Sequence, residues 1–266
     1  MSNCISYIVP TYNGQNYIRK TIDSIHKGNF EDGDEIIMID DCSNDETINI
    51  TQELLKDQKI DKLILLEKNI GEGLAKNTAI KKIKNKYFFC LDQDNILAPN
   101  SITPLRKLID KYDAVTFGEI RYFQFSTLLV SHKHFFDTGI ISLGNFQRSL
   151  INPGFSGNLL YSKKAWEEAG EFENVVLESW NLMYKMILKN MSILTIPKSY
   201  YFHRFGHESA YVSATRNFKE NELLKKAIPI SANQDVDLIY SKSQIKYNTF
   251  VFYLVRSIRK ILNVFS

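Results

Sequence analysis

Short apolar segments alternate with segments of helical spacing over residues 4–91, and this alternation constrains the fold more than any other feature of the chain. The apolar segments have the length of buried strands, and the segments between them repeat apolar residues every three or four positions. Strand and helix in this order form βαβ units, whose strands are parallel. The sequence therefore predicts an α/β fold with a mostly parallel central sheet flanked by helices. The expected strands are Cys4–Val9, Glu35–Ile39, Leu63–Leu66 and Tyr87–Leu91, and the expected helices are Tyr17–Lys27, a segment through Ile48 and Leu55, and Leu74–Ile83.

The alternation of strand and helix segments is less regular after residue 94. Residues 119–152 are predicted to be irregular, and Tyr200–Ser209 is predicted to be a polar and aromatic loop. The remaining expected helices are Ser101–Ile109, Lys163–Ala169 and Glu178–Lys189, and the remaining expected strands are Ala114–Gly118, Asn158–Tyr161 and Met191–Ile196.

Composition narrows the class of protein. With 266 residues, 44% of them apolar and 24% charged, the chain resembles a soluble globular protein with one large α/β domain and at most a small appendage. A net charge of +3 is too weak to predict a nucleic-acid partner. The three cysteines lack metal-ligand spacing, which favours reduced thiols. No signal-peptide pattern opens the sequence, and no segment reaches the roughly 18 uncharged apolar residues of a spanning helix. We therefore expect a cytoplasmic protein that does not bind nucleic acid.

Two carboxylates follow the fourth expected strand, in the sequence Asp92-Gln93-Asp94. Ligands of open α/β sheets bind just beyond the carboxyl ends of the strands. Two carboxylates at that place can hold Mg²⁺ or Mn²⁺, with water and phosphate oxygens completing the shell. The same residues are also compatible with a plain polar turn, in which Asp94 and Asn95 cap the following segment.

Five segments together carry a resemblance to a known family, over roughly residues 4–210. They are Ile8–Asn13, Ile39–Asp45, Asn69–Gly71 with Ala75–Asn77, Leu91–Asp94, and Gly157–Leu160 with Gly170 and Phe172. In this order and spacing they resemble the inverting family 2 glycosyltransferases of the GT-A fold. The resemblance implies a GT-A domain with a Rossmann-like sheet over residues 1–215, in which 1–100 bind the nucleotide sugar and 101–215 form the acceptor side. Residues 216–266 would be a C-terminal extension.

The resemblance also implies an activity, that of a metal-dependent glycosyltransferase of the hexosyltransferase class. Such an enzyme moves a sugar from a nucleotide-diphospho-sugar, most often UDP-linked, to a surface glycan or a lipid-linked saccharide. The implied cofactor is Mn²⁺ or Mg²⁺, which bridges the two phosphates and neutralises charge on the UDP leaving group.

Residues of the donor site follow from the same resemblance. Asp41 would accept from a base N–H, Tyr12 would stack on the base, and Asp92 would face the ribose near the metal. From the residues alone, Tyr12 is equally compatible with packing inside its own loop, and His207 with a structural or surface role. The residues implied to bind the nucleotide sugar are Pro10, Tyr12, Asp41, Asn77, Asp92 and Arg204, and those implied to hold the metal are Asp94, Asp92 and His207.

The catalytic base is where the sequence departs from the family. An inverting transfer needs a group that takes the proton of the acceptor hydroxyl, and the family supplies it from a Glu-Asp pair before a tryptophan. Here the run is Glu178-Ser179-Trp180. A neutral serine cannot accept that proton unless another base lies beside it. Glu178 is therefore the predicted base, with Glu173 as an alternative, and impaired transfer is the third interpretation.

Two rival functions follow from these observations. The loss of the aspartate at Ser179 suggests a sugar-nucleotide or glycan-binding module without turnover. A sugar nucleotidyltransferase would share the α/β plan, but Pro10–Gly14 has one glycine and lacks the basic residues that hold a triphosphate.

The end of the chain, Asn248–Phe265, has apolar residues at spacings of three or four and a group of basic residues around Arg256 and Lys260. A basic amphipathic helix of this kind can lie on the inner face of the cell membrane as a peripheral contact. It can equally pack on the core or on a second subunit of a homo-oligomer.

Overall fold

The computed structural model describes residues 3–123, 130–134, 139–149 and 157–205. His207 and the predicted extension over 216–266, with its basic segment 248–266, lie outside the described residues.

Within the described part of the chain, ten strands form one mixed sheet in the order β3-β2-β1-β4-β9-β6-β10-β5, with β7 paired to β6 and β8 to β10. Strands β1 to β4 are parallel, as predicted, and β6 is parallel to β10. The other pairings are antiparallel. The strands are β1 (Ile5–Thr11), β2 (Glu35–Asp40), β3 (Lys62–Leu65), β4 (Tyr87–Cys90), β5 (Ile96–Leu97), β6 (Ala114–Phe123), β7 (Val130–His134), β8 (Gly139–Ile140), β9 (Leu159–Ser162) and β10 (Ile193–Phe205).

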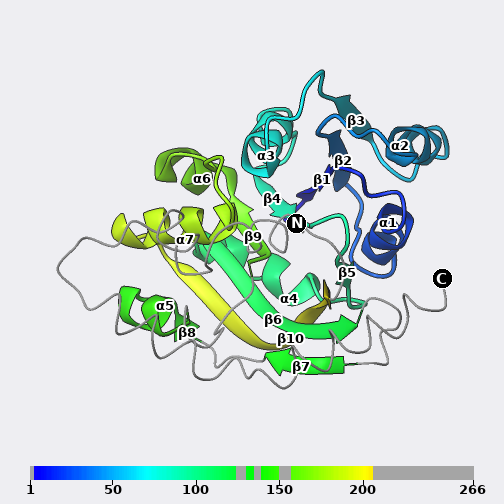
Figure 1. The fold of residues 1–266 in the computed structure, drawn as a ribbon. Helices are drawn as coiled ribbons and strands as arrows, with labels where there is room; N and C mark the ends of the chain where they lie inside the picture. The colour runs from blue at the N-terminus through cyan, green and yellow to red at the C-terminus, as the bar shows by residue number, and fades with distance from the viewer. Residues whose placement is uncertain (1–2, 124–129, 135–138, 150–156, 206–266) are drawn as a thin grey trace, which may run out of the picture.

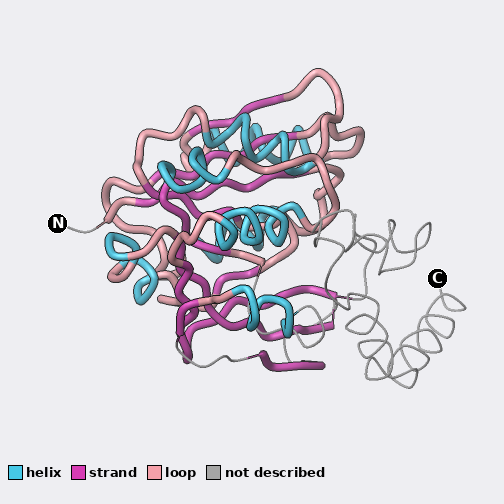
Figure 2. Tube along the Cα trace, turned by 90° about the vertical axis from the view of Figure 1, so that its left-hand side faces the viewer, coloured by secondary structure: helices cyan, strands magenta, loops and turns pink. Residues whose placement is uncertain are grey.

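Helices cover both faces of the sheet, as Figures 1 and 2 show. One hydrophobic core lies between the sheet and helices α1, α2 and α4, and the other lies between the sheet and α3, α5, α6 and α7. Successive residues of β1 alternate between the two cores, because side chains of a strand point to opposite faces. The helices are α1 (Ile18–His26), α2 (Thr47–Lys56), α3 (Glu72–Ile80), α4 (Thr103–Arg106), α5 (Leu143–Ser149), α6 (Lys163–Ala169) and α7 (Glu178–Leu188), with a 3₁₀ turn at Ile109–Lys111.

Pro10 lies inside β1, although the sequence suggested that it ends the strand. Pro10 pairs in register with Ile39 of β2. The Ile8 carbonyl accepts from Leu91 N on the opposite side, and Pro10, two residues later, faces that same side. Pairing with β4 has ended there, so the missing N–H of the proline costs no ladder bond.

Two predictions for the second half of the chain are wrong. The expected loop at Tyr200–Ser209 is strand as far as Phe205, and part of the expected irregular region belongs to β6, β7, β8 and α5. These strands carry charged residues that hide their pattern. Buried Glu119 on β6, for example, is paired with Arg121 and hydrogen-bonded by Tyr201 of β10. The expected helix at Ser101–Ile109 is also shorter, one turn of α4 followed by the 3₁₀ turn.

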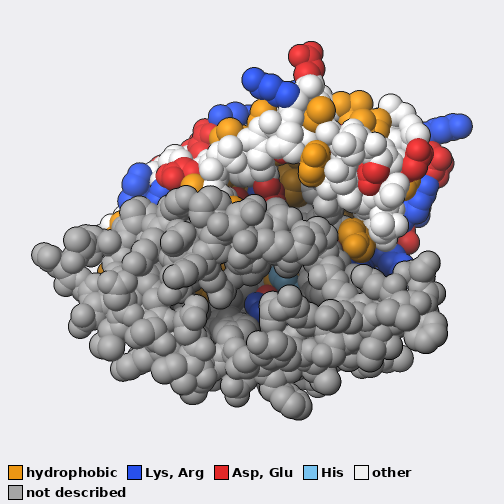
Figure 3. Space-filling view, in the orientation of Figure 1, with side chains coloured by type: hydrophobic (Ala, Val, Ile, Leu, Met, Phe, Trp, Pro, Cys, Tyr) orange, Lys and Arg blue, Asp and Glu red, His pale blue; other side chains and the backbone are white. Residues whose placement is uncertain are grey.

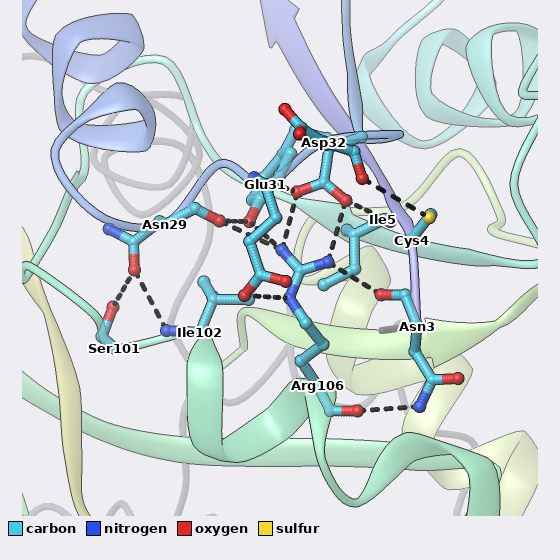
Figure 4. Close-up of polar contacts among 11 residues, drawn as sticks. Asn3, Cys4, Ile5, Asn29, Glu31, Asp32, Ser101, Ile102 and Arg106 are labelled. Carbon is cyan, nitrogen blue, oxygen red and sulfur yellow. Dashed lines mark hydrogen bonds and ion pairs between the residues drawn. The ribbon is translucent and has the colours of Figure 1, made fainter. Parts of the chain in front are cut away.

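A buried ionic cluster closes the sheet at the amino ends of β1 and β2 (Figure 4). The guanidinium of Arg106, from α4, donates to both carboxylate oxygens of Asp34, at 2.8 and 2.6 Å. It also donates to the carbonyls of Asn3 and Asn29. This cluster ties α4 to the segments that begin β1 and β2.

The described helices are all too short or too polar to cross a membrane. On the face in Figure 3, the acidic and basic side chains of the described residues are interspersed. The described part of this face therefore shows no extended patch of one charge.

Candidate active site

The loop after β4 carries Asp92 and Asp94 at the carboxyl end of the sheet, where the sequence placed them. Asp92 Oδ2 accepts a hydrogen bond from Asn95 Nδ2 at 3.0 Å. The side chain of Asp92 remains 35% exposed, so it can still contact a ligand. Thr21 of α1 supports the loop from below, because its hydroxyl lies 2.7 Å from Gln93 O and 2.9 Å from Asn95 O.

Gln93, the residue between the two aspartates, joins this loop to the one after β1. Its Oε1 accepts from Tyr12 N at 3.0 Å and from Thr11 Oγ1 at 2.8 Å, and its Nε2 donates to Tyr12 O at 3.0 Å. Gly14 makes room for it, since a Cβ at that position would lie 2.1 Å from Gln93 Oε1. Gln93 was not predicted from the sequence as a site residue. The single glycine in the facing loop, Gly14, is the sequence feature that points to it.

Lys76, on α3, is the centre of the site, and the sequence analysis did not predict this. Its side chain is 1% exposed, and its ammonium nitrogen contacts three carboxylates. The distances are 2.6 Å to Glu178 Oε1, 2.7 Å to Glu72 Oε1 and 3.3 Å to Asp92 Oδ1. One buried cation therefore holds together the acidic loop after β4, the start of α3 and the start of α7.

The charges of this cluster influence one another strongly. Burial alone would lower the pKa of Lys76, but the carboxylates of Glu178, Glu72 and Asp92 overcome this effect and raise its pKa well above the ordinary value. Lys76 therefore stays charged. Desolvation raises the pKa of Asp92, Lys76 opposes that change, and the carboxylate of Asp94 adds to it. Desolvation likewise raises the pKa of Glu72, against the effect of Lys76.

Glu178, the predicted base, begins α7 and points into this cluster. Besides the contact with Lys76, its Oε1 accepts a hydrogen bond from Ser179 Oγ at 2.9 Å. Leu177, directly before it, has φ of 68°, a left-handed conformation that is uncommon for leucine. The carboxylate of the alternative base, Glu173, contacts Lys185 at 3.2 Å and Asn181 at 3.5 Å, and the described contacts of Lys76 do not include it.

The start of α3 packs closely against the segment that leads to α7. A Cβ at Gly73 would lie 2.2 Å from the carbonyl oxygen of Glu173, so only glycine fits. Asn77 is buried on the same helix, and its amide exchanges hydrogen bonds with Phe172, donating to Phe172 O at 2.8 Å and accepting from Phe172 N at 3.0 Å. The structure thus gives Asn77 a structural role that the sequence did not predict, and its contact with a nucleotide sugar stays a prediction.

The predicted base pocket lies beside these elements. Tyr12 is 44% exposed after β1, which suits a side chain that stacks on a ligand. Asp41 follows β2 and is buried, with its two carboxylate oxygens accepting from Ile70 N at 2.8 Å and Gly71 N at 2.9 Å. Asp41 therefore fixes the loop after β3, and a further bond to a base N–H would use its remaining lone pairs. Pro10 is buried within β1.

Arg204 reaches the acidic loop from β10. Its Nε donates to Asp94 O at 3.2 Å, and its guanidinium lies between the rings of Tyr17 and Tyr122, at 4.8 and 5.1 Å from their centroids. Both stacking contacts hold the planar cation in one orientation. The structure thus places Arg204 beside Asp94, as a phosphate contact of the predicted kind requires.

The donor set is compatible with a hard divalent cation. Asp92 and Asp94 lie on one loop after β4, and the side chain of Asp92 is 35% exposed. Carboxylate oxygens are the ligands that Mg²⁺ and Mn²⁺ prefer. Among the described residues, no three His, Cys, Asp or Glu side chains gather as a complete metal site. Phosphate and water oxygens would therefore have to complete the shell.

Comparison with known proteins agrees with this geometry. Residues 6–170, more than half of the chain, match the family described as Glycosyl transferase family 2. An uncharacterized glycosyltransferase of Rickettsia prowazekii is 39% identical over 112 residues, which are 42% of this chain and 34% of that protein. The poly(ribitol-phosphate) beta-N-acetylglucosaminyltransferase TarS of Staphylococcus aureus is 30% identical over 109 residues, 40% of this chain and 19% of TarS. The chain thus spans about a third or less of these curated relatives.

Solved structures show the same fold. The crystal structure of S. aureus TarS 1–349 in complex with UDP-GlcNAc has a TM-score of 0.65 at 22% identity, and covers 89% of this chain and 69% of that one. The mannosyltransferase PcManGT from Pyrobaculum calidifontis, in complex with GDP-Man and Mn²⁺, has a TM-score of 0.65 at 15% identity, with 91% and 70% covered. These likenesses confirm the predicted GT-A fold.

Proposed function

This chain belongs to glycosyl transferase family 2, and on that premise we propose that it transfers a sugar from a UDP-linked donor to a saccharide or lipid-linked acceptor, with inversion and with a divalent metal. The observation that carries the proposal is the convergence of Asp92, Lys76 and Glu178 at the carboxyl end of the sheet. A UDP-linked donor is supported by the TarS 1–349 structures in complex with UDP and with UDP-GlcNAc.

The donor would lie over the loops after β1, β2 and β4. Tyr12 and Asp41 would bind the base, and Asp92 the ribose. Gln93, in the loop after β4, is hydrogen-bonded to Tyr12 and so keeps that loop at a fixed spacing from the loop after β1. Arg204, held between two tyrosine rings, would contact the diphosphate. Fixed positions of this kind lower the entropic cost of reaching the transition state.

Asp94, Asp92 and His207 would hold the metal. The bound Mn²⁺ or Mg²⁺ would neutralise negative charge on the departing UDP. On the other side of the sugar, Glu178 would receive the proton of the acceptor hydroxyl.

We place the donor half of the domain in residues 1–100 and the acceptor half in 101–215. The contacts between Lys76 of α3 and Glu178 of α7 support an active site at the boundary of the two halves. The basic apolar sequence of 248–266 supports a peripheral membrane contact near a lipid-linked acceptor. Sedimentation of the full chain with anionic vesicles, compared with a chain truncated at residue 247, tests that contact.

A second candidate, a sugar-nucleotide-binding module without turnover, is favoured by one observation. Ser179 stands where the family carries an aspartate, and the carboxylate of Glu178 beside it is already occupied by Lys76 at 2.6 Å.

To decide between these functions, the Tm and the release of UDP are measured with a panel of UDP-, GDP- and dTDP-sugars in the presence of Mn²⁺. For the transferase we expect one UDP-sugar both to raise the Tm and to release UDP. A binding module would show the Tm increase without UDP release. If no nucleotide sugar changes the Tm, both candidates are wrong.

A further inference from the structure

The hydroxyl of Ser179 donates its proton to the carboxylate of Glu178. The distance from Ser179 Oγ to Glu178 Oε1 is 2.9 Å, and both side chains are buried at the start of α7. A hydroxyl has one proton and two lone pairs. Because its proton points at Glu178, the oxygen of Ser179 presents lone pairs to any hydroxyl that approaches it.

We propose that Ser179 is a catalytic residue of this chain, which relays the proton of the acceptor hydroxyl to Glu178. This inference rests on the proposed transferase function and goes beyond it. As the acceptor oxygen bonds to the anomeric carbon, the bond from that carbon to the phosphate oxygen breaks, and its electron pair leaves with UDP. The acceptor proton passes to Ser179 Oγ, while the hydroxyl proton of Ser179 passes to Glu178 Oε1. Ser179 is thus unchanged at the end of the step, and Glu178 holds the proton.

The surroundings of Glu178 allow it to receive that proton. Lys76 contacts three carboxylates, those of Glu72, Asp92 and Glu178, so the group carries more negative than positive charge. When Glu178 becomes neutral, Lys76 keeps two anionic partners. The ammonium is therefore not left buried without a counter-charge, which would be costly.

Gly157 lies next to Ser179. Gly157 has no side chain, and a Cβ at that position would lie 3.9 Å from Ser179 Cβ and 3.5 Å from Trp180 Nε1, in ordinary contact with both. The glycine thus leaves room for a small group beside the hydroxyl. Glu178 and Ser179 are equally buried, at 8% each. Oε1 of Glu178 already receives two donors, whereas the hydroxyl oxygen of Ser179 still presents lone pairs, so we assign the first contact to Ser179.

The experiment measures single-turnover UDP release from the UDP-sugar that the panel identifies, with water as the acceptor. The variants are Ser179→Ala, Ser179→Thr, Ser179→Asp, Glu178→Gln, and Glu178→Gln combined with Ser179→Asp. We expect Ser179→Ala to lower the rate by about 10²-fold or more without changing the Kd for UDP, and Ser179→Thr to restore much of it. Ser199→Ala is the matched control, since Ser199 is also buried and donates to Ser101 O at 2.6 Å.

The double variant separates a relay from a structural role. Glu178→Gln should lower the rate strongly in the natural chain, but only slightly in the Ser179→Asp background, where the aspartate accepts the proton directly. In mixtures of H₂O and D₂O, the rate of the natural chain should follow a curve when plotted against the fraction of D₂O, because two protons move in the step. The rate of Ser179→Asp should follow a straight line, because one proton moves.

Full activity of Ser179→Ala alongside an inactive Glu178→Gln would overturn the relay and make Glu178 the direct base. A rate of the natural chain that depends linearly on the fraction of D₂O would overturn the relay too. In both cases UDP binding and release by the natural chain would still support the proposed function. If the natural chain releases no UDP from any donor, the proposed function and the relay fail together.

Discussion

The ammonium nitrogen of Lys76 lies 2.6 Å from Oε1 of Glu178, across 102 residues of sequence, and this contact joins α3 to α7. Because the same nitrogen also contacts Glu72 and Asp92, both the stability and the chemistry of the site should depend on it.

Lys76→Met should destabilise the protein by about 3 kcal/mol at pH 8, because it leaves three carboxylates close together without a cation. Without the lysine, repulsion raises the pKa values of these carboxyl groups in the folded state. They are neutral at low pH and repel one another as the pH rises. Urea denaturation should therefore show that the deficit relative to the natural chain widens from pH 5 to pH 8. A deficit that is independent of pH would contradict the electrostatic explanation, and Lys76→Arg should show a smaller deficit.

Asp94→Asn should weaken the binding of UDP in the presence of Mn²⁺ by about tenfold or more, because an amide is a poorer ligand than a carboxylate for a hard cation. Calorimetry with and without Mn²⁺ measures the effect. The control is Asp23→Asn, at an exposed position of α1. If the Asp94 variant and the control bind UDP with equal affinity, Asp94 does not hold the metal.

Gln93→Leu should weaken UDP binding and lower the free energy of unfolding by about 1–3 kcal/mol, since it breaks the hydrogen bonds to Thr11 and Tyr12. Gln93→Glu keeps the accepting oxygens but loses the donor to Tyr12 O and adds charge beside two aspartates. It should therefore weaken UDP binding as well. Gln52→Leu, on the exposed side of α2, is the control. Natural UDP affinity in both Gln93 variants would show that the two loops do not depend on this side chain.

The buried carboxylate of Glu119 should make the free energy of unfolding fall in acid. Burial would raise the pKa of its carboxyl group, but His203, Arg121 and the hydrogen bonds from Tyr201 and Arg121 overcome this effect and lower its pKa to about 2. A folded-state pKa below the usual 4.5 means that the stabilisation is complete above about pH 4.5 and is lost as the pH falls toward 2. Glu119→Gln should remove on the order of 3 kcal/mol at pH 6 and flatten the stability profile in that window. A profile as steep as that of the natural chain would contradict this assignment.

Arg106→Met should cost about 3–5 kcal/mol, because it leaves Asp34 buried without its cation (Figure 4). The Kd for UDP should not change, since the cluster lies at the opposite end of the sheet from Asp92. Arg19→Met removes an exposed pair with Glu53 and should cost no more than about 1 kcal/mol. Equal costs for the two variants in urea denaturation would show that burial of Arg106 adds nothing.

Much of the donor half could be predicted from sequence because its information is local. Buried parallel strands have continuous apolar runs, and each ends in polar residues, so Asp92 and Asp94 were placed correctly at a strand end. Strands β6 and β10 were harder to predict, because Glu119, Arg121 and His203 interrupt their apolar pattern. These side chains are tolerated through partners on the same strand and on the neighbouring one, and an apolar pattern along the sequence cannot show such partners.

The site was predictable where one residue type suggests one chemistry. A carboxylate at a strand end suggests a metal ligand, so Asp92 and Asp94 could be named from the sequence, and the family resemblance named Glu178; their roles stay predictions. Lys76 and Gln93 were missed because their roles depend on contacts with Glu178 and with Tyr12, which are 102 and 81 residues away. The hydrogen bonds of Asn77 to Phe172 could not be predicted for the same reason.

The missing side chain at Gly73 limits how this fold can be recombined with its relatives. Helix α3 and the segment before α7 fit each other so closely that an added Cβ would lie 2.2 Å from Glu173 O. A hybrid joined near residue 100 would bring together an α3 and an α7 that never adapted to each other. A crossover after Phe205 would transfer both surfaces together with β10, which pairs with β6 and carries Arg204. For protein engineers, the exchangeable module therefore runs from β1 through β10, and residues 1–100 alone are not a portable part.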